Sequence, residues 1–147
     1  MNTYHPPIPL PLELPIAGLL GVPLHSSQDI PHALRVGLPF SSLSNLAKQL
    51  ELSQTEALHL TDISEASLRR RRKVGLFSSE ESERIFRYAE VVQAAFDLFG
   101  DEESARGWLK RPRAYFQEQS PLEVARSEYG ARKLLEYIAQ LEVGSYL

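Results

Sequence analysis

The residues best suited to chemistry form one basic run, Arg69 to Lys73, which carries five consecutive positive charges. Guanidinium and ammonium groups bind phosphate oxygens and the acceptor atoms of base edges, so this run offers non-covalent recognition of nucleic acid. It ends a stretch, Ser53 to Lys73, in which two short helix signatures are joined by a turn. A helix-turn-helix with a basic second helix is built to enter the major groove of DNA.

Local signals around this unit predict both of its helices. Ser53 and Glu56 have the spacing of a capping box, in which hydroxyl and carboxylate accept hydrogen bonds from amides of the first turn. Asp62 stands at the turn position where a left-handed backbone is usual, and Asp tolerates that conformation better than most residues. Ser64 then caps the second helix. We therefore expect one helix on each side of Asp62.

The second helix has two different faces. Counting 3.6 residues per turn, Leu68 turns toward the first helix, together with Ile63 just outside the cap. The candidate DNA-binding residues are the cap and the opposite face: Ser64, Ala66, Arg69, Arg70 and Lys73. A solvated helix end, stabilised by the helix dipole, is the alternative interpretation of the cations.

Two side chains depart from the usual helix-turn-helix pattern. Leu58 occupies a position where such units prefer a small residue, and Thr61 one where they prefer an apolar residue. The unit is therefore interpreted as degenerate, and its binding to DNA is a hypothesis to be tested.

The distribution of charge favours local binding to DNA over general coating. The chain has a net charge of −3, and without the five cations of the basic run the remainder sums to −8. A protein that coats nucleic acid would be basic throughout, since affinity for phosphates grows with the number of released counterions. We therefore expect specific base contacts, made by a homodimer that reads two half-sites.

The composition indicates a globular protein without a metal or cofactor. Its 147 residues allow one domain or two small ones, and a hydrophobic content of 43% is sufficient for a core. The absence of cysteine excludes disulfides and cysteine-based zinc sites, and fits a cytoplasmic location. Of the scattered histidines only His25 and His32 could share a face, and two histidines without a third ligand do not indicate a metal site. The other two are His5 and His59.

Membrane and secretory segments are not expected either. No run of about 18 apolar residues occurs, so no membrane span is predicted. The apolar stretch from Leu10 to Leu24 is interrupted by prolines and lacks a basic start, so it does not resemble a signal peptide.

The chain divides into three parts. Residues 1–24 hold six of the ten prolines and are expected to form an extended arm without a regular helix. Residues 25–77 form the predicted DNA-binding domain. There a helix from about Gln28 to Val36, capped by Ser26 or Ser27, precedes another from about Ser41 to Glu51. These two helices are expected to buttress the DNA-reading pair.

Residues 78–147 are predicted to form a second small helical domain, which makes the whole chain all-α. Ser78 and Glu81 make another capping box, and the helix that follows runs to about Phe99 and stops at Gly100. Its apolar side chains lie along two edges, so either its own domain or a twin subunit must cover more than one side. Further helices are expected from Asp101 to about Leu109, from Ser120, and from about Gly130 to Gly144.

Several stretches of the second half resemble a known family when taken together. They are LRRRRKVGLFSSEESERIFRYAE, AAFDLFGDEESARGWLKRP and SPLEVARSEYGARKLLEYIAQLEVG, which span Leu68 to Gly144. In this combination the chain is similar to antitoxins of the Xre/ParS/MbcA type, whose toxin-binding domain follows a helix-turn-helix. Residues 27–63 also resemble the helical half that precedes it in the family.

The resemblance implies a two-gene system in which this chain binds a toxic enzyme, holds it inactive, and does no chemistry itself. Partners of the Xre type are mostly RES-domain toxins that consume NAD, whereas ParS-type relatives pair with ADP-ribosylating toxins. In the family the last helix and tail reach the mouth of the toxin's active site. That role falls here on Tyr129, Arg132, Lys133, Glu136, Tyr137, Tyr146 and Leu147. Binding of the complex to its own operator is also implied.

Two other classes of function are weighed against this one. A stand-alone transcription regulator would bind DNA tightly and with strong salt dependence, but without a protein partner. An enzyme finds almost no support, since the sequence has no phosphate-cradling glycine loop, nucleophile elbow or ligand triad. Packing beside the last helix is the alternative interpretation of Tyr129 and Tyr137.

Overall fold

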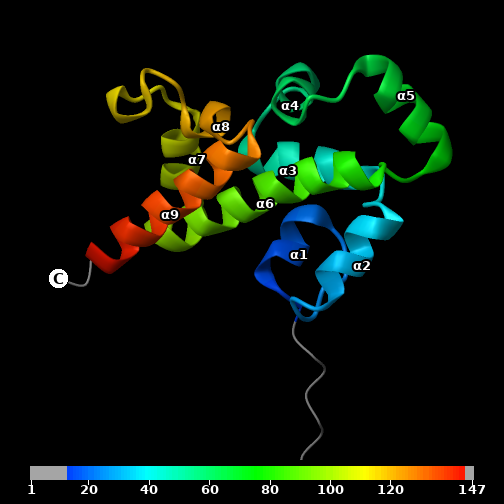
Figure 1. The fold of residues 1–147 in the computed structure, drawn as a ribbon, viewed down its shortest axis with the longest axis horizontal. Helices are drawn as coiled ribbons and strands as arrows, with labels where there is room; N and C mark the ends of the chain where they lie inside the picture. The colour runs from blue at the N-terminus through cyan, green and yellow to red at the C-terminus, as the bar shows by residue number, and fades with distance from the viewer. Residues whose placement is uncertain (1–12, 145–147) are drawn as a thin grey trace, which may run out of the picture.

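The computed structural model describes residues 13–144, which form a wholly helical body with two isolated β-bridges and no strand (Figure 1). The helices of the first half are α1 (Pro15–Leu20), α2 (Asp29–Val36), α3 (Ser41–Leu50), α4 (Gln54–Thr61) and α5 (Glu65–Val74). Those of the second half are α6 (Ser79–Phe99), α7 (Glu102–Lys110), the 3-10 helix η1 (Ala114–Phe116), α8 (Pro121–Val124) and α9 (Glu128–Gly144). The all-α prediction is confirmed. Within the same residues, no helix is both long and apolar enough to cross a membrane.

The 21-residue helix α6 is the axis on which the other helices pack. The Ser78 and Glu81 capping box starts it as predicted, and Gly100, in the left-handed conformation with φ of 68°, ends it. Helices α1, α2, α3 and α4 contact the first part of α6, and α7 and α9 pack along the rest of it. Except at Phe99, which is 37% exposed, the two apolar edges of α6 are therefore covered by this chain itself and do not require a twin subunit.

The predicted helix-turn-helix is present as α4 and α5. Ser53 and Glu56 form the complete capping box, Asp62 has a left-handed backbone with φ of 53°, and Ser64 caps α5. Leu68 and Ile63 are buried as expected. These caps could be predicted from the sequence because each joins residues only a few positions apart.

The two irregular residues of the unit are accommodated inside the core. Thr61 is buried, and its hydroxyl donates a hydrogen bond of 2.7 Å to the carbonyl of Ala57, so the polar group is satisfied within α4. Leu58 is buried as well. The departures from the usual pattern therefore leave the helix-turn-helix geometry intact.

The prediction of an extended arm over residues 1–24 is wrong for part of its range. Pro15–Leu20 forms the helix α1, which packs on α3 and α6 and buries Ile16, Ala17, Leu19 and Leu20. Proline at the first helical position removes an amide that has no intrahelical partner, so Pro15 permits the helix that its neighbours were expected to prevent. Residues 1–12 lie outside the described part of the chain.

The start of α2 also differs from the prediction. Neither Ser26 nor Ser27 caps it; instead the carboxylate of Asp29 accepts hydrogen bonds from the backbone N–H groups of His25 and Ser26, at 2.9 and 3.1 Å. These two bonds lower the pKa of Asp29 below its ordinary value. Helix α2 packs mainly on α6, whereas α3 contacts α4, so only α3 directly buttresses the helix-turn-helix.

In the second half α7 and α9 both pack on α6, and α9 runs in the same general direction as α6 (Figure 1). Asp101 caps α7 and Ser120 caps α8, with Pro121 at its first position. Helix α9 begins at Glu128, two residues before the predicted start at Gly130. Gly130 is buried against the end of α8, where a side chain would collide with the carbonyl of Val124. The glycine therefore marks a close approach of two segments and not the first residue of a helix.

Candidate nucleic-acid and protein interfaces

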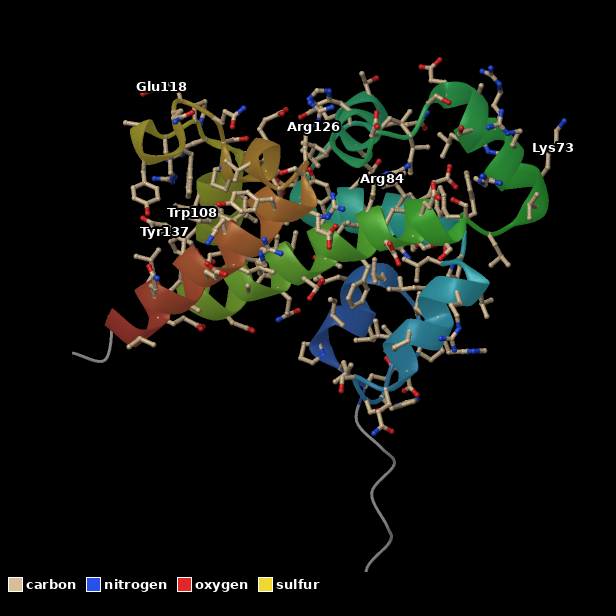
Figure 2. All side chains as sticks on the ribbon, in the orientation of Figure 1. Lys73, Arg84, Trp108, Glu118, Arg126 and Tyr137 are labelled. Atoms are coloured by element: carbon tan, nitrogen blue, oxygen red, sulfur yellow. The ribbon has the colours of Figure 1, made fainter. Side chains whose placement is uncertain are left out.

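The exposed face of α5 presents three cations of the basic run. Arg69, Arg70 and Lys73 are exposed, as is Ala66 in the turn before them. The guanidinium of Arg70 donates to Ser67 Oγ at 3.0 Å through Nη2, and the residue remains exposed. Lys73 lies at the outer edge of the molecule (Figure 2). The structure thus brings the predicted DNA-binding side chains together on one accessible surface.

Ser64 has a different environment from the rest of that set. Its hydroxyl accepts the backbone N–H of Ser67 at 3.0 Å and so caps the helix. It also lies 3.0 Å from Ser67 Oγ. The contacts of Ser64 are therefore those of a helix cap, at the exposed start of α5.

The other two cations of the run contact residues outside α5, although Arg72 is itself exposed. Arg71 Nε donates to Glu81 Oε1 at 2.6 Å, and this pair joins α5 to the start of α6. The guanidinium of Arg72 lies 5.5 Å from the centre of the Phe40 ring, a cation–π contact with the residue before α3. A basic run that looks uniform in sequence is therefore divided between an outward face and an anchoring face.

Glu81 is the buried partner in this anchor. Burial alone would raise its pKa, but the backbone N–H of Ser78 and the Arg71 guanidinium both bind the carboxylate and hold the pKa below its ordinary value. Only 7% of the Glu81 side chain is exposed, against 27% for Arg71. The same carboxylate thus completes the cap of α6 and fixes the orientation of α5.

Arg84 on α6 fixes the turn between α4 and α5, a role that sequence analysis missed. Its Nε donates to the carbonyl of Thr61 at 2.7 Å and its Nη2 to that of Asp62 at 3.4 Å. A cation at this place satisfies carbonyls at the end of α4 and interacts favourably with the helix dipole. The two partners lie more than twenty residues before Arg84, so no local pattern could indicate the contact.

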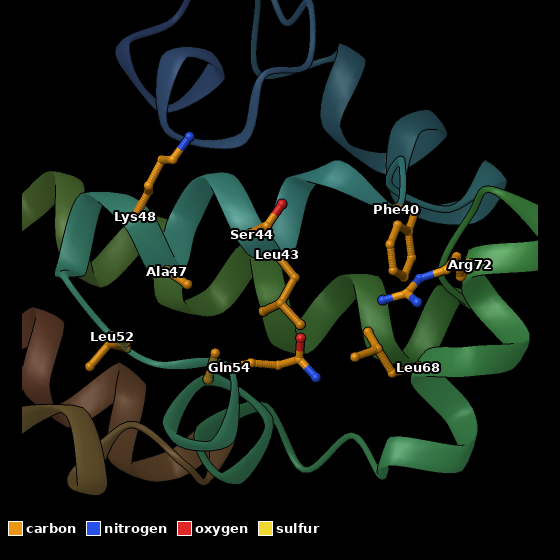
Figure 3. A pocket seen from close by; sticks show the side chains of 10 residues that line it. Phe40, Leu43, Ser44, Ala47, Lys48, Leu52, Gln54, Leu68 and Arg72 are labelled. Carbon is orange, nitrogen blue, oxygen red and sulfur yellow. The ribbon is translucent and has the colours of Figure 1, made fainter.

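A groove of about 290 Å³ separates α5 from α3 and α4 (Figure 3). Its floor is apolar and includes Leu43, Ala47 and Leu68, while Arg72 and Gln54 stand at its edge. Leu68 is the single buried residue of α5. Helix α5 is therefore held chiefly by Leu68, the Arg71 and Glu81 pair, the contact of Arg72 with Phe40, and the hydrogen bond from Phe40 N to Gly75 O at 2.9 Å.

The predicted toxin-facing residues of α9 also gather on one side. Tyr129 is 63% exposed, and the cationic groups of Arg132 and Lys133 lie over its ring at 5.4 and 5.5 Å. Lys133 Nζ lies 3.3 Å from the carboxylate of Glu136. Tyr137 is half-buried and contacts other aromatic rings. Tyr146 and Leu147 lie outside the described residues.

The two surfaces differ from a metal centre in the side chains that they bring together. Over residues 13–144 no three His, Asp or Glu side chains converge in a way that could hold a metal ion. The exposed side chains of the two surfaces include cations, the Glu136 carboxylate and the Tyr129 ring, which suit recognition of another macromolecule.

Curated relatives match the sequence of this chain, one of them over nearly its whole length. A protein named Antitoxin Xre from Yersinia enterocolitica is 31% identical over 148 residues, a match that covers 99% of this chain and 99% of the relative. The chain belongs to the Xre family of antitoxins. An Antitoxin Xre from Photorhabdus laumondii is 30% identical over 132 residues, covering 88% of this chain and 89% of the relative. Another, from Pseudomonas putida, is 29% identical over 65 residues, covering 44% and 41%.

Two family descriptions match adjoining parts of this Xre antitoxin. Residues 29–90 match the antitoxin Xre-like helix-turn-helix domain, and residues 94–144 match the antitoxin Xre/MbcA/ParS C-terminal toxin-binding domain. The resemblance inferred from the sequence is confirmed. The protein is an antitoxin of a toxin-antitoxin system, with a helix-turn-helix DNA-binding domain and a toxin-binding domain that implies a cognate toxin. Family membership points to a regulator and not to an enzyme.

Proposed function

We propose that this Xre antitoxin neutralises a RES-domain toxin that consumes NAD, and that it represses its own operon by binding operator DNA. The observation that carries the proposal is the match of residues 94–144 to the toxin-binding domain, on a body whose opposite end presents the basic face of α5. The RES class is favoured over an ADP-ribosylating toxin because RES partners predominate among Xre-type relatives. In this proposal the antitoxin itself performs no reaction; it acts by blocking the active site of its partner.

Neutralisation is assigned to α9 and the residues after it. The exposed Tyr129, its two neighbouring cations Arg132 and Lys133, and Glu136 form a surface with an aromatic centre and a charged rim, the composition that protein interfaces favour. We expect Tyr137, Tyr146 and Leu147 to continue this surface into the mouth of the toxin's active site. Side chains placed there, the aromatic ring of Tyr146 among them, would compete with an anionic nucleotide.

Operator binding is assigned to Ser64, Ala66, Arg69, Arg70 and Lys73. Exposure of the three cations on a capped helix supports insertion of α5 into the major groove, with Ser64 and Ala66 at the end that approaches the bases. A palindromic operator requires a two-fold reader, so we propose a homodimer on DNA in the cytoplasm. Light scattering at micromolar concentration tests this, and a clean monomer both free and on DNA would contradict it.

Co-expression tests the proposal directly. The protein encoded beside this chain, produced alone, is expected to stop growth and to deplete cellular NAD. Co-expression of the full antitoxin should restore growth and NAD, and the two proteins should co-purify. A chain lacking residues 145–147 should still co-purify but restore growth less well. Absence of both rescue and complex would refute neutralisation and favour a stand-alone regulator; growth arrest with normal NAD would refute the RES assignment alone.

A further inference from the structure

Four aromatic rings from three separate elements form one connected surface at the end of the molecule remote from α5. They are Trp108 of α7, Tyr115 and Phe116 of η1, and Tyr137 of α9, here called the aromatic platform. Tyr115 and Tyr137 are stacked with ring centres 4.6 Å apart, and Phe116 meets both edge-on at 5.1 and 5.4 Å. Trp108 lies parallel to Tyr137, with ring centres 6.5 Å apart. Figure 2 labels these two residues at the end of the molecule away from Lys73.

The platform is left incomplete by the chain that builds it. Tyr115 is 70% exposed, the largest exposed fraction among the large hydrophobic side chains of residues 13–144. Phe99, 37% exposed, extends the surface from the end of α6 and lies 5.7 Å from Trp108. Aromatic side chains contribute most to stability when they are covered, so a cluster held at the surface is typical of a binding site.

The backbone that carries Tyr115 is held in an unfavourable conformation. Gln117 and Glu118 have φ of 56° and 65°, two consecutive left-handed residues of which neither is glycine. Hydrogen bonds across the loop fix this shape, from Glu118 N to Arg113 O at 2.8 Å and from Arg113 N to Gln119 O at 3.2 Å. Strain of this kind persists where the surrounding structure imposes it, and it concentrates at functional sites. The loop thus presents Tyr115 outward in a fixed orientation.

Charge beside the rings indicates the kind of partner. The guanidinium of Arg113 lies 5.2 Å from the centre of the Trp108 ring, and Arg111 is exposed next to it. Tyrosine, tryptophan and arginine are the residue types that dominate binding energy in protein interfaces. A partner that fits this surface is a protein with an apolar contact centre and carboxylates at its rim.

We propose that the aromatic platform is the anchor on which the cognate toxin docks, with Tyr115 as its central contact. The inference rests on the proposed function, which it extends from α9 to the loop between α7 and α8. The toxin is favoured over a second copy because all four rings lie within residues 94–144, the toxin-binding match, and Tyr137 joins the platform to the α9 surface. The platform also lies far from α5, where a dimer would have to form to pair two recognition helices (Figure 1).

The first test compares affinities for the purified product of the adjacent gene, measured by calorimetry. Tyr115→Ala should weaken binding at least about tenfold, because truncating a central aromatic contact has that effect, whereas Tyr115→Phe keeps the ring and should stay near the wild type. Val36→Ala removes an apolar side chain that is 53% exposed on α2 and should leave affinity unchanged. Circular dichroism and the melting temperature establish that each variant is folded.

The second measurement uses the only tryptophan of the chain, Trp108. The antitoxin labelled with 5-fluorotryptophan should give one fluorine resonance, and saturating unlabelled toxin should shift it. A resonance that stays at its free position while calorimetry reports binding would overturn the proposal and leave the proposed function standing. An unchanged affinity of Tyr115→Ala for the toxin would also overturn the proposal. The same holds if this variant loses only self-association, measured by light scattering. Failure of the wild type to bind the adjacent product would remove both.

Discussion

At the residue scale, the five cations of the basic run divide into groups with different tasks. Arg71 binds Glu81 and Arg72 lies on Phe40, so these two orient α5, while Arg69, Arg70 and Lys73 face outward. Position around the helix decides the task, because successive residues are about 100° apart. Changes at neighbouring arginines should therefore affect different properties of the protein.

Arg69→Ala should weaken binding to DNA from upstream of the operon about tenfold or more if the arginine contacts a base, with little loss of stability. If it contacts a phosphate, the dependence of log affinity on log salt should fall by about one. Fluorescence anisotropy over a salt series measures both effects. Arg35→Ala, which removes an exposed arginine from the last turn of α2, is the matched control and should change neither. Equal DNA affinities of the wild type, Arg69→Ala and Arg35→Ala would contradict the assignment of α5 to DNA binding.

Arg71→Ala should instead lower the free energy of unfolding by about 2 kcal/mol, since it leaves the Glu81 carboxylate without its charged partner. The lowered pKa of Glu81 means that its stabilising contribution is present above the ordinary value of 4.5 and is lost as pH falls through the folded value. Urea denaturation between pH 3 and 7 should therefore show a smaller fall in stability on acidification for Glu81→Gln than for the wild type. Parallel curves of unfolding free energy against pH for the two proteins would show that the Glu81 carboxylate is not responsible for the loss of stability in acid.

At the element scale, the sequence was most informative where a structure depends on near neighbours. The caps at Ser53, Ser64 and Ser78 and the stop at Gly100 each join residues three or four positions apart, so spacing alone predicted them. Helix α1 escaped prediction because it depends on burial against α3 and α6, which outweighs a proline-rich composition. No side chain caps α2; the Asp29 carboxylate instead binds the backbone N–H groups of His25 and Ser26 in the segment before the helix.

Contacts between distant elements could not be predicted from any pattern. Lys110 at the end of α7 donates to the carbonyls of Leu50 and Glu51 at 3.1 and 3.0 Å, and so caps α3 from the other half of the chain. His59 Nε2 of α4 lies 2.7 Å from Glu123 Oε1 of α8. The aromatic platform likewise joins residues of α7, η1 and α9 that are spread over about thirty positions. Sequence indicated Tyr137 through family resemblance, whereas its partner Tyr115 carried no signal.

The junction of α8 and α9 provides a test of packing between elements. Gly130→Ala should destabilise the protein by about 2 kcal/mol or more, because the new methyl group would collide with the carbonyl of Val124 and with Ser127. Gly107→Ala, also inside a helix, finds its nearest atom on the flexible Arg111 at 3.8 Å and should stabilise by about 0.5 to 1 kcal/mol through helix propensity. Thermal and urea denaturation measure both. Two changes of the same sign would contradict this description of α9.

At the scale of the whole molecule, the two recognition surfaces lie at opposite ends of a continuous helical body. Helix α6 begins beside α5 and ends beside the aromatic platform, and the Xre helix-turn-helix and toxin-binding matches meet within it, between residues 90 and 94 (Figure 1). Lys110, Arg84 and the His59 and Glu123 pair join the halves elsewhere. In the function proposed above, this separation lets a toxin be held at one end while the other end remains open to DNA.

The most direct measurement of this account is the mass of the assembly formed by three components: this Xre antitoxin, the protein encoded beside it, and DNA from upstream of the operon. Mass photometry should detect a species that contains all three, and Arg69→Ala should remove the DNA while Tyr115→Ala removes the toxin. Displacement of the antitoxin from DNA by an equimolar amount of toxin would contradict the account, because it would mean that the two surfaces are not independent.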